Sequence, residues 1–177
     1  VELDPDRVQI VLPGDDEFQM PEGGLNIRWP DPPLVQEARM LNHKWYAALA
    51  YVRANRLNRI VIDSPEARFG IMTAGKAYQD VRQALNDLGL DTEACRRVGL
   101  RVMKVGCVWP LNAHDARHFA EGLDEILVVE EKRQILEYAL KEELYNWRED
   151  VRPNVYGKFA AQDHAGGEWS EPRSEWL

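Results

Sequence analysis

Cysteine, basic charge and long apolar runs are all scarce in this sequence of 177 residues. The two cysteines, Cys95 and Cys107, cannot form a disulfide framework or supply the four thiolates of an iron–sulfur cluster within one chain. The net charge of −8 argues against a nucleic-acid partner. No apolar run approaches the ~20 residues of a membrane helix, and the N-terminus lacks a signal-peptide pattern. We therefore expect a cytoplasmic protein with reduced thiols and no membrane partner.

The sequence does contain enough apolar material for one domain, since 45% of its residues are apolar and six are Trp. The first residue is Val1 rather than Met, and the sequence stops abruptly at Leu177. These ends are as compatible with an excised fragment as with a natural protein. We expect a fragment whose native contacts have been cut away.

Both ends of the chain differ in composition from its middle. Residues 1–33 hold six of the ten Pro and eight acidic against two basic residues, which predicts an extended acidic arm. Within this arm, Val8 to Leu12 could form a short edge strand. Residues 151–177 are predicted to form an extended tail or linker. It would include an edge strand at 154–159, and Trp169 and Trp176 would pack on a neighbouring surface. The folded domain is expected at 34–150.

Helical periodicity begins at Leu34 and continues to Leu57, where Asn58 is a plausible stop. This spacing predicts one buried apolar face, made of Val35, Ala38, Leu41, Trp45, Ala48, Tyr51 and Val52.

Apolar strands then alternate with helices along the rest of the chain. Strands are predicted at 60–63, 69–73, 100–105 and 125–130, and helices at 76–88, 92–98, 112–121 and 132–147. The strand at 125–130 contains a continuous apolar run, which predicts burial on both faces. This alternation indicates an α/β fold, a three-layer αβα sandwich with a mostly parallel sheet of about five strands.

The stretch Gly70 to Ala77 nearly matches a phosphate-binding loop. Its last position lacks the Ser or Thr that ligates magnesium, and Gly70 lies inside the strand, so nucleotide hydrolysis is not expected. Instead, Gly75 would make the turn from strand to helix, with Lys76 pointing to solvent or a neighbour. A weaker anion site remains open, formed by Thr73, Gly75 and Lys76 at a helix N-terminus.

Three other groups of residues suggest chemistry but have simpler explanations. His114 and His118 share a helix face at zinc-protease spacing. No third ligand is suggested nearby, although His43 and His164 could lie anywhere in space, so no metal site is predicted. Glu130 and Glu131 lie at the carboxyl end of the strand predicted at 125–130. They could include a functional carboxylate, they could match a helix dipole, or one of them could be buried at a domain or subunit boundary and paired with a basic group. The third interpretation, pairing with a basic group, is favoured.

The cysteines also offer no catalytic group. No His is placed by the sequence to activate Cys95 or Cys107, so both are interpreted as packing residues. A self-contained hydrolase would need a nucleophile–base pair, which the sequence does not offer. From the residues alone, no catalytic residue is predicted.

Several segments together resemble a known family. They are Phe-Gly-Ile-Met-Thr-Ala-Gly-Lys-Ala-Tyr at 69–78, Val-Gly-Cys-Val-Trp-Pro-Leu at 105–111, the strand ending in Glu-Glu-Lys at 119–132, and Leu-Tyr-Asn-Trp at 144–147. Their order and spacing are similar to the transketolase C-terminal-like domain of 2-oxoacid:ferredoxin oxidoreductases, most of all the large fused indolepyruvate form.

The resemblance implies that the parent enzyme oxidatively decarboxylates 2-oxoacids to acyl-CoA with thiamine diphosphate, magnesium and iron–sulfur clusters, and passes electrons to ferredoxin. The sequence has neither a Gly-Asp-Gly…Asn-Asn signature nor clustered cysteines, so these cofactors are expected to bind elsewhere in the parent. The chain would be a noncatalytic structural and interface domain, contacting other domains of the same polypeptide and helping to build a homodimer. The alternative is a small anion- or effector-binding module that uses the Gly75 loop.

Overall fold

The computed structural model describes residues 4–26 and 29–158 of the chain. It divides into two compact units, residues 1–57 and 58–177, and each is described by itself. Within the described ranges, no helix is both long enough and apolar enough to cross a lipid bilayer.

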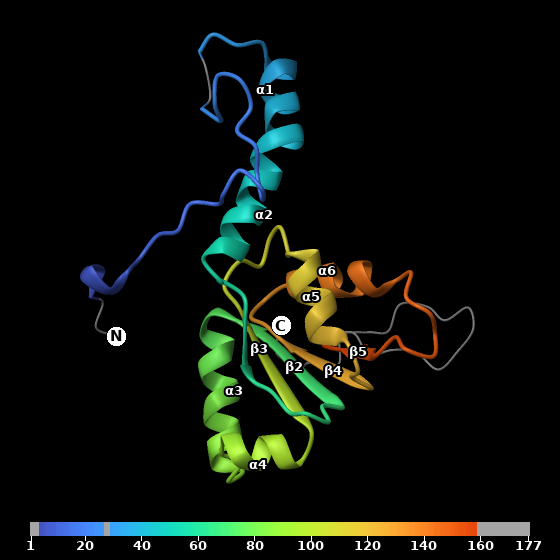
Figure 1. Ribbon diagram of the computed structural model, residues 1–177. Coiled ribbons are helices and arrows are strands. Elements are labelled where there is room, and N and C mark those ends of the chain that lie inside the picture. Colours follow the sequence, from blue (N-terminus) through green and yellow to red (C-terminus); the bar gives the residue numbers. More distant parts are fainter. Residues whose placement is uncertain (1–3, 27–28, 159–177) are drawn as a thin grey trace. The chain divides into compact units, whose positions relative to one another are not determined.

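The first unit is built around two helices that follow one another. A 3₁₀ turn at Pro5–Arg7 precedes α1 (Pro33–Arg39), and α2 (Trp45–Ala54) follows after a π-helical stretch at Met40–Lys44 (Figure 1). The predicted helix is thus confirmed, although it contains a π segment and ends three residues before Leu57.

Two details of the sequence prediction for the first unit are wrong. Val8 to Leu12 forms no strand, because the backbone N–H and C=O of Val11 bond to the Asn55 side chain at 2.8 Å instead of to another strand. The predicted apolar face is also largely exposed. Leu41 is 56% exposed, and the buried apolar residues among those described in this unit are Ala50 and Val52.

The second unit contains a five-stranded sheet within its described residues. Its strands are β1 (Arg59–Ile62), β2 (Phe69–Ala74), β3 (Leu100–Val105), β4 (Glu125–Val129) and β5 (Asn154–Tyr156). The order is β1-β3-β2-β4-β5, with β1 antiparallel to β3 and the other neighbours parallel. The prediction of a mostly parallel sheet of about five strands is confirmed. Phe159, predicted to end the last strand, lies outside the described residues, as do Trp169, Trp176 and His164.

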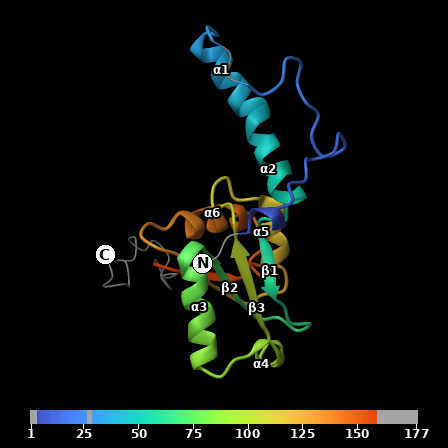
Figure 2. The ribbon, with the colours of Figure 1, turned by 90° about the vertical axis from the view of Figure 1, so that its left-hand side faces the viewer.

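Helices cover both faces of this sheet, which gives the three layers. They are α3 (Gly75–Asp87), α4 (Thr92–Arg97), α5 (Ala113–Ala120) and α6 (Ile135–Leu144). Figure 1 shows α3 and α4 on one side of the strands and α5 and α6 on the other, and Figure 2 shows α3 running alongside the strands.

Two separate apolar clusters fill the spaces between the layers. The larger, beneath α5 and α6, includes Met72, Met103, Phe119, Leu136 and Leu140. The smaller, beneath α3 and α4, includes Ile62, Val81, Leu85, Cys95 and Val102. Neighbouring residues such as Val102 and Met103 enter opposite clusters because successive strand residues point to opposite faces. The apolar strand pattern therefore encodes two cores.

Gly70, the second residue of β2, is a glycine for a packing reason. A Cβ atom added there would come within 2.5 Å of Leu123 Cδ1 and 2.8 Å of Phe119 Cζ. The larger cluster therefore leaves no space for a side chain at this position, which explains a glycine inside a strand.

The prediction that β4 is buried on both faces is wrong in one place. Leu127 is 46% exposed, although Ile126 and Val128 are buried. Leu127 pairs with Ile71 and Tyr156 and shares their face, where the cluster beneath α3 and α4 extends over β1, β3 and β2 and reaches β4 at Val129. An apolar part of the sheet therefore faces outward.

Candidate functional site at the carboxyl edge of the sheet

The carboxyl ends of β2 and β4 meet at one edge of the sheet. Two cavities, of about 510 and 460 Å³, are both lined by Ile135. The smaller one is also lined by Gly75, Lys76, Val108 and residues 130–133. We call this smaller space the carboxyl-edge cavity. Because ligands of open α/β sheets bind outside the carboxyl ends of the strands, it is the natural candidate site.

Gly75 and Lys76 reach this cavity, and Thr73 does not. Gly75 has a φ of +56° and starts α3, whose amino end has no side-chain cap. Thr73 is fully buried on the face covered by α3, and its hydroxyl has no hydrogen-bond partner among the described residues. Gly75 therefore makes the predicted turn, while an anion site at this loop stays a prediction.

Lys76 is already engaged by a neighbour one helical turn away. Its Nζ donates to both carboxylate oxygens of Asp80 at 2.7 Å. The hydrogen bond and the charge of Asp80 raise the pKa of Lys76 above its ordinary value of 10.5, and Glu131 adds a smaller effect in the same direction. Lys76 is therefore a fully protonated, exposed ammonium group at neutral pH.

Glu130 has a role that the favoured sequence reading missed. Its carboxylate accepts hydrogen bonds from the backbone N–H groups of Ile135, Leu136 and Glu137 at 2.9–3.0 Å. A carboxylate at this place satisfies the unpaired N–H groups of a helix and matches the helix dipole. Matching of the helix dipole is thus the role of Glu130, while the pairing of one of the two carboxylates with a basic group at a boundary stays a prediction. The cap also explains why α6 starts at Ile135 rather than at the predicted Lys132.

Asn58 organises the loop that follows β3, and sequence reasoning treated it only as a helix stop. Its Oδ1 accepts from the backbone N–H groups of Gly106 and Cys107 at 3.0 and 3.2 Å, and its Nδ2 donates to Asp115 Oδ2 at 3.0 Å. Asn112 caps α5 from the same loop by accepting from Asp115 N. In the sequence, the only indication of this role was the position of an Asn just before a strand.

The histidine pair shows no arrangement for a metal. His114 and His118 stack with ring centroids 6.5 Å apart. Across the described residues, no group of three or more His, Cys, Asp or Glu is placed to hold a metal ion.

The two cysteines occupy different environments. Cys95 is buried in the smaller cluster, where desolvation raises the pKa of its thiol, so it is a packing residue as predicted. Cys107 is half-buried in the loop after β3, where its Sγ lies 3.5 Å from the Trp109 carbonyl oxygen. Neither thiol has a described histidine as a hydrogen-bond partner.

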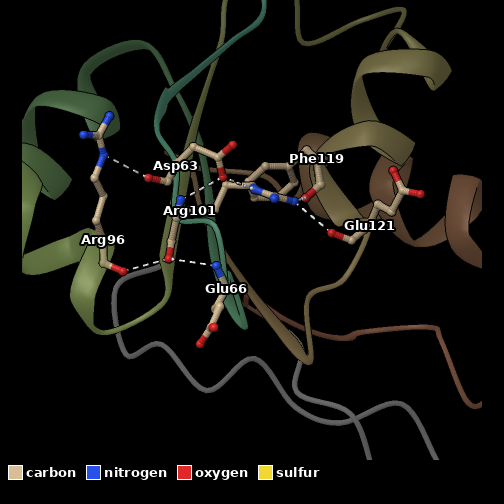
Figure 3. A network of polar contacts seen from close by, with 7 residues as sticks. Asp63, Glu66, Arg96, Arg101, Phe119 and Glu121 are labelled. Carbon is tan, nitrogen blue, oxygen red and sulfur yellow. Dashed lines mark hydrogen bonds and ion pairs between the residues drawn. The ribbon is translucent and has the colours of Figure 1, made fainter.

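A second polar cluster, missed by the sequence analysis, lies at the opposite edge of the sheet. Figure 3 shows Arg101 reaching from β3 to Asp63, at 2.7 Å, and to the backbone carbonyls of Phe119 and Glu121, each at 2.9 Å. Arg96 donates to the Asp63 carbonyl at 3.2 Å. Arg101 therefore ties β1 and β3 to the end of α5, which is a structural task.

The iron–sulfur clusters implied by the resemblance do not fit the thiol donors of this chain. Four-thiolate ligation needs more cysteines than the two present, and these lie in different environments, one on the buried side of α4 and one in the loop after β3. Of the two carboxylates that line the carboxyl-edge cavity, Glu130 is occupied by the α6 cap. No step of chemistry through these cofactors is assigned to this chain.

Comparison with known families gives a match over residues 58–177, to the model described as the indolepyruvate ferredoxin oxidoreductase middle domain. The indolepyruvate oxidoreductase subunit IorA of Methanothermobacter marburgensis is 30% identical over 134 residues, covering 64% of this chain and 20% of that protein. IorA of Pyrococcus abyssi is 29% identical over 135 residues, covering 74% of this chain and 19% of that protein. The chain thus spans about one fifth of the length of these relatives.

Two solved structures align with parts of this chain. A 2-oxoglutarate:ferredoxin oxidoreductase from Magnetococcus marinus aligns with a TM-score of 0.45 and 17% identity, over 79% of this chain and 22% of that one. A split-gene transketolase, described as an inactive beta4 tetramer, aligns with a TM-score of 0.44 and 17% identity, over 57% and 31% of the two chains.

Proposed function

Because the chain belongs to the indolepyruvate ferredoxin oxidoreductase middle-domain family, we propose that it is a noncatalytic structural and interface domain of a larger enzyme. That enzyme would be a thiamine-diphosphate-dependent oxidoreductase that decarboxylates indolepyruvate or a related 2-oxoacid to an acyl-CoA. The match of residues 58–177 to the family, together with the one-fifth coverage of the IorA relatives, carries this proposal.

The polar side chains of the candidate site bond to other groups of the same chain, which supports a noncatalytic role. Glu130 caps α6, Lys76 pairs with Asp80, and Asn58 holds the loop after β3. A general acid, base or nucleophile has to reach a substrate atom, whereas these groups are directed at their own chain. The polar groups at the carboxyl edge thus act mainly as supports for loops and helix ends.

The exposed apolar surface supports the interface role. In the second unit, Phe69 and Leu127 are both more than 40% exposed on one face of neighbouring strands. In the first unit, Trp29 is 92% exposed and Leu34 is 77% exposed. Apolar patches of this kind mark contact surfaces. We assign them to other domains of the same polypeptide and to a homodimer interface, with ferredoxin a partner of the parent enzyme in the cytoplasm.

The cofactors would then be held outside this chain. Thiamine diphosphate, magnesium and the iron–sulfur clusters would bind to other parts of the parent enzyme, and coenzyme A would be its co-substrate. What this chain supplies is a rigid sheet whose edges and open face position its neighbours.

Edge substitutions in the full-length enzyme test the proposal. Lys76→Ala and Lys132→Ala should leave kcat within about threefold of the wild type, since losing a catalytic group usually costs ~10²-fold or more. Leu127→Asp, on the open face, should instead weaken assembly, measured by analytical ultracentrifugation. A ~10²-fold loss of kcat in either lysine variant, with assembly intact, would show that this domain takes part in catalysis.

A second candidate function is anion binding at the Gly75 loop. It is favoured by the uncapped amino end of α3 beside Lys76, Lys132 and Arg133 around one cavity. Titration of the chain with inorganic phosphate, followed by amide NMR, should then shift Gly75 and Lys76 with a saturable curve that Lys76→Ala weakens. Shifts that stay linear with phosphate concentration would remove this candidate.

A further inference from the structure

Helix α6 contains a carboxylate with no exposed surface. Glu137 is 0% exposed, and its Oε1 pairs with Lys141 Nζ, one turn along the helix. Its Oε2 accepts a hydrogen bond from the backbone N–H of Lys158 at 2.9 Å. A buried charge is tolerated only where charged and hydrogen-bonding partners compensate it, so these contacts are required by the burial itself.

The chain passes directly over this carboxylate just after β5. A Cβ atom added to Gly157 would collide with Glu137 Oε2 and Cδ. Only a residue without a side chain allows the backbone to approach this closely. We call residues 157–158 the exit segment, because the chain leaves the sheet through them.

The first turn of α6 links the exit segment to the carboxyl edge. The Glu137 backbone N–H donates to Glu130 Oε1 at 3.0 Å, while the Glu137 side chain holds the exit segment. Glu130 in turn begins the loop at 130–134, and residues 130–133 line the carboxyl-edge cavity. One residue of α6 therefore contacts both the loop after β4 and the chain after β5.

We propose that Glu137 is a latch that couples the path of the chain after β5 to the first turn of α6, and through Glu130 to the loop at 130–134. Displacing the exit segment removes the Lys158 N–H from a buried carboxylate, which destabilises the first turn of α6. A displacement of the exit segment therefore also changes the conformation of residues 130–133, which line the carboxyl-edge cavity. The latch consists only of contacts within this chain, so it stands independently of the proposed function.

Amide hydrogen exchange of the whole 177-residue chain tests the latch. Gly157→Ala changes no residue of α6, yet it should speed exchange at Lys158 and also at Ile135, Leu136 and Glu137. We expect exchange to become about tenfold faster or more at these four amides. Lys158 would lose its hydrogen bond to Glu137, and the other three amides would have weaker hydrogen bonds to Glu130. Exchange at Val81 in α3, which packs in the smaller cluster, should stay unchanged.

A second variant and a matched control make the result decisive. Glu137→Gln keeps the shape but turns an N–H₂ group toward a donor, so it should speed the same four amides. Glu142→Gln removes an exposed carboxylate from the same helix and should change none of them. The proposal is overturned if Gly157→Ala speeds Lys158 alone, or if both variants also lose protection at Val81, since that would be global unfolding rather than a local latch.

Discussion

The two units of this chain bury their apolar side chains to very different extents. In the second unit, strands and helices enclose two clusters that contain fully buried Phe119, Met72 and Leu136. In the described part of the first unit, the buried apolar residues are Ala50 and Val52, and large side chains such as Leu34 and Leu41 are exposed. Both units have periodic apolar patterns, so a pattern alone does not make a core. It needs a second element to pack against.

Separating the units should give the largest effect. Residues 58–177 alone should unfold in urea in a single cooperative transition with a slope of ~1–3 kcal/mol/M, because both apolar clusters lie within them. Residues 1–57 alone should show no cooperative transition, since few of their apolar side chains are buried. Circular dichroism of each fragment during urea titration measures this. A cooperative transition in fragment 1–57 would contradict the comparison.

Truncating one large side chain in each unit sharpens the contrast. Phe119→Ala should lower the free energy of unfolding by ~3–5 kcal/mol, because it empties a fully buried position. Leu41→Ala, at an exposed position, should change it by no more than ~0.5 kcal/mol. Urea unfolding of the two variants gives both values. Similar losses at both positions would mean that the first unit has a core after all.

A matched pair of asparagines tests the same contrast for polar groups. Asn58→Ala should cost ~2–3 kcal/mol, since it leaves the N–H groups of Gly106 and Cys107 in a partly buried loop without their acceptor. Asn55→Ala breaks the bonds to Val11, which are exposed, so water should replace them at a cost of ~0.5–1 kcal/mol. Urea midpoints compare the two. An equal cost would show that exposure does not decide the value of these bonds.

The smallest expected effect concerns the exposed pair Lys76–Asp80. The pKa of Lys76 is raised, so its contribution to stability is fully present below pH 10.5 and is lost as the pH rises through the higher folded-state pKa. Asp80→Asn should move the pKa of Lys76 back toward 10.5, as measured by an NMR titration of the side chain. An unchanged pKa in this variant would mean that Asp80 is not its main cause.

Elements whose pattern is local were predicted well from the sequence. The strands β2 and β3 and the helices α3 and α4 lie within one or two residues of the predicted bounds. Gly89, with a φ of +70°, follows α3 where the sequence placed its end. Apolar periodicity and glycine chemistry act within a few residues, so they can be read without a structure.

Contacts between distant residues were the ones that the sequence analysis missed. The capping role of Glu130 was not favoured, because its hydrogen-bond donors, the N–H groups at the start of α6, lie five to seven residues ahead and depend on the loop geometry. Asn58 and Gly106 are 48 residues apart, and nothing local marks them as partners. Side-chain chemistry gives the kind of bond, and only the fold gives the partner.

The sequence by itself thus determined the α/β class, the number and kind of most elements in the second unit, and the resemblance to the family. The tertiary structure alone decided which apolar faces are covered and that Leu127 is exposed. It also decided which carboxylates form hydrogen bonds within the chain. The reason is physical. Secondary structure follows from interactions between near neighbours, whereas burial and pairing depend on elements that meet only after the sheet has assembled.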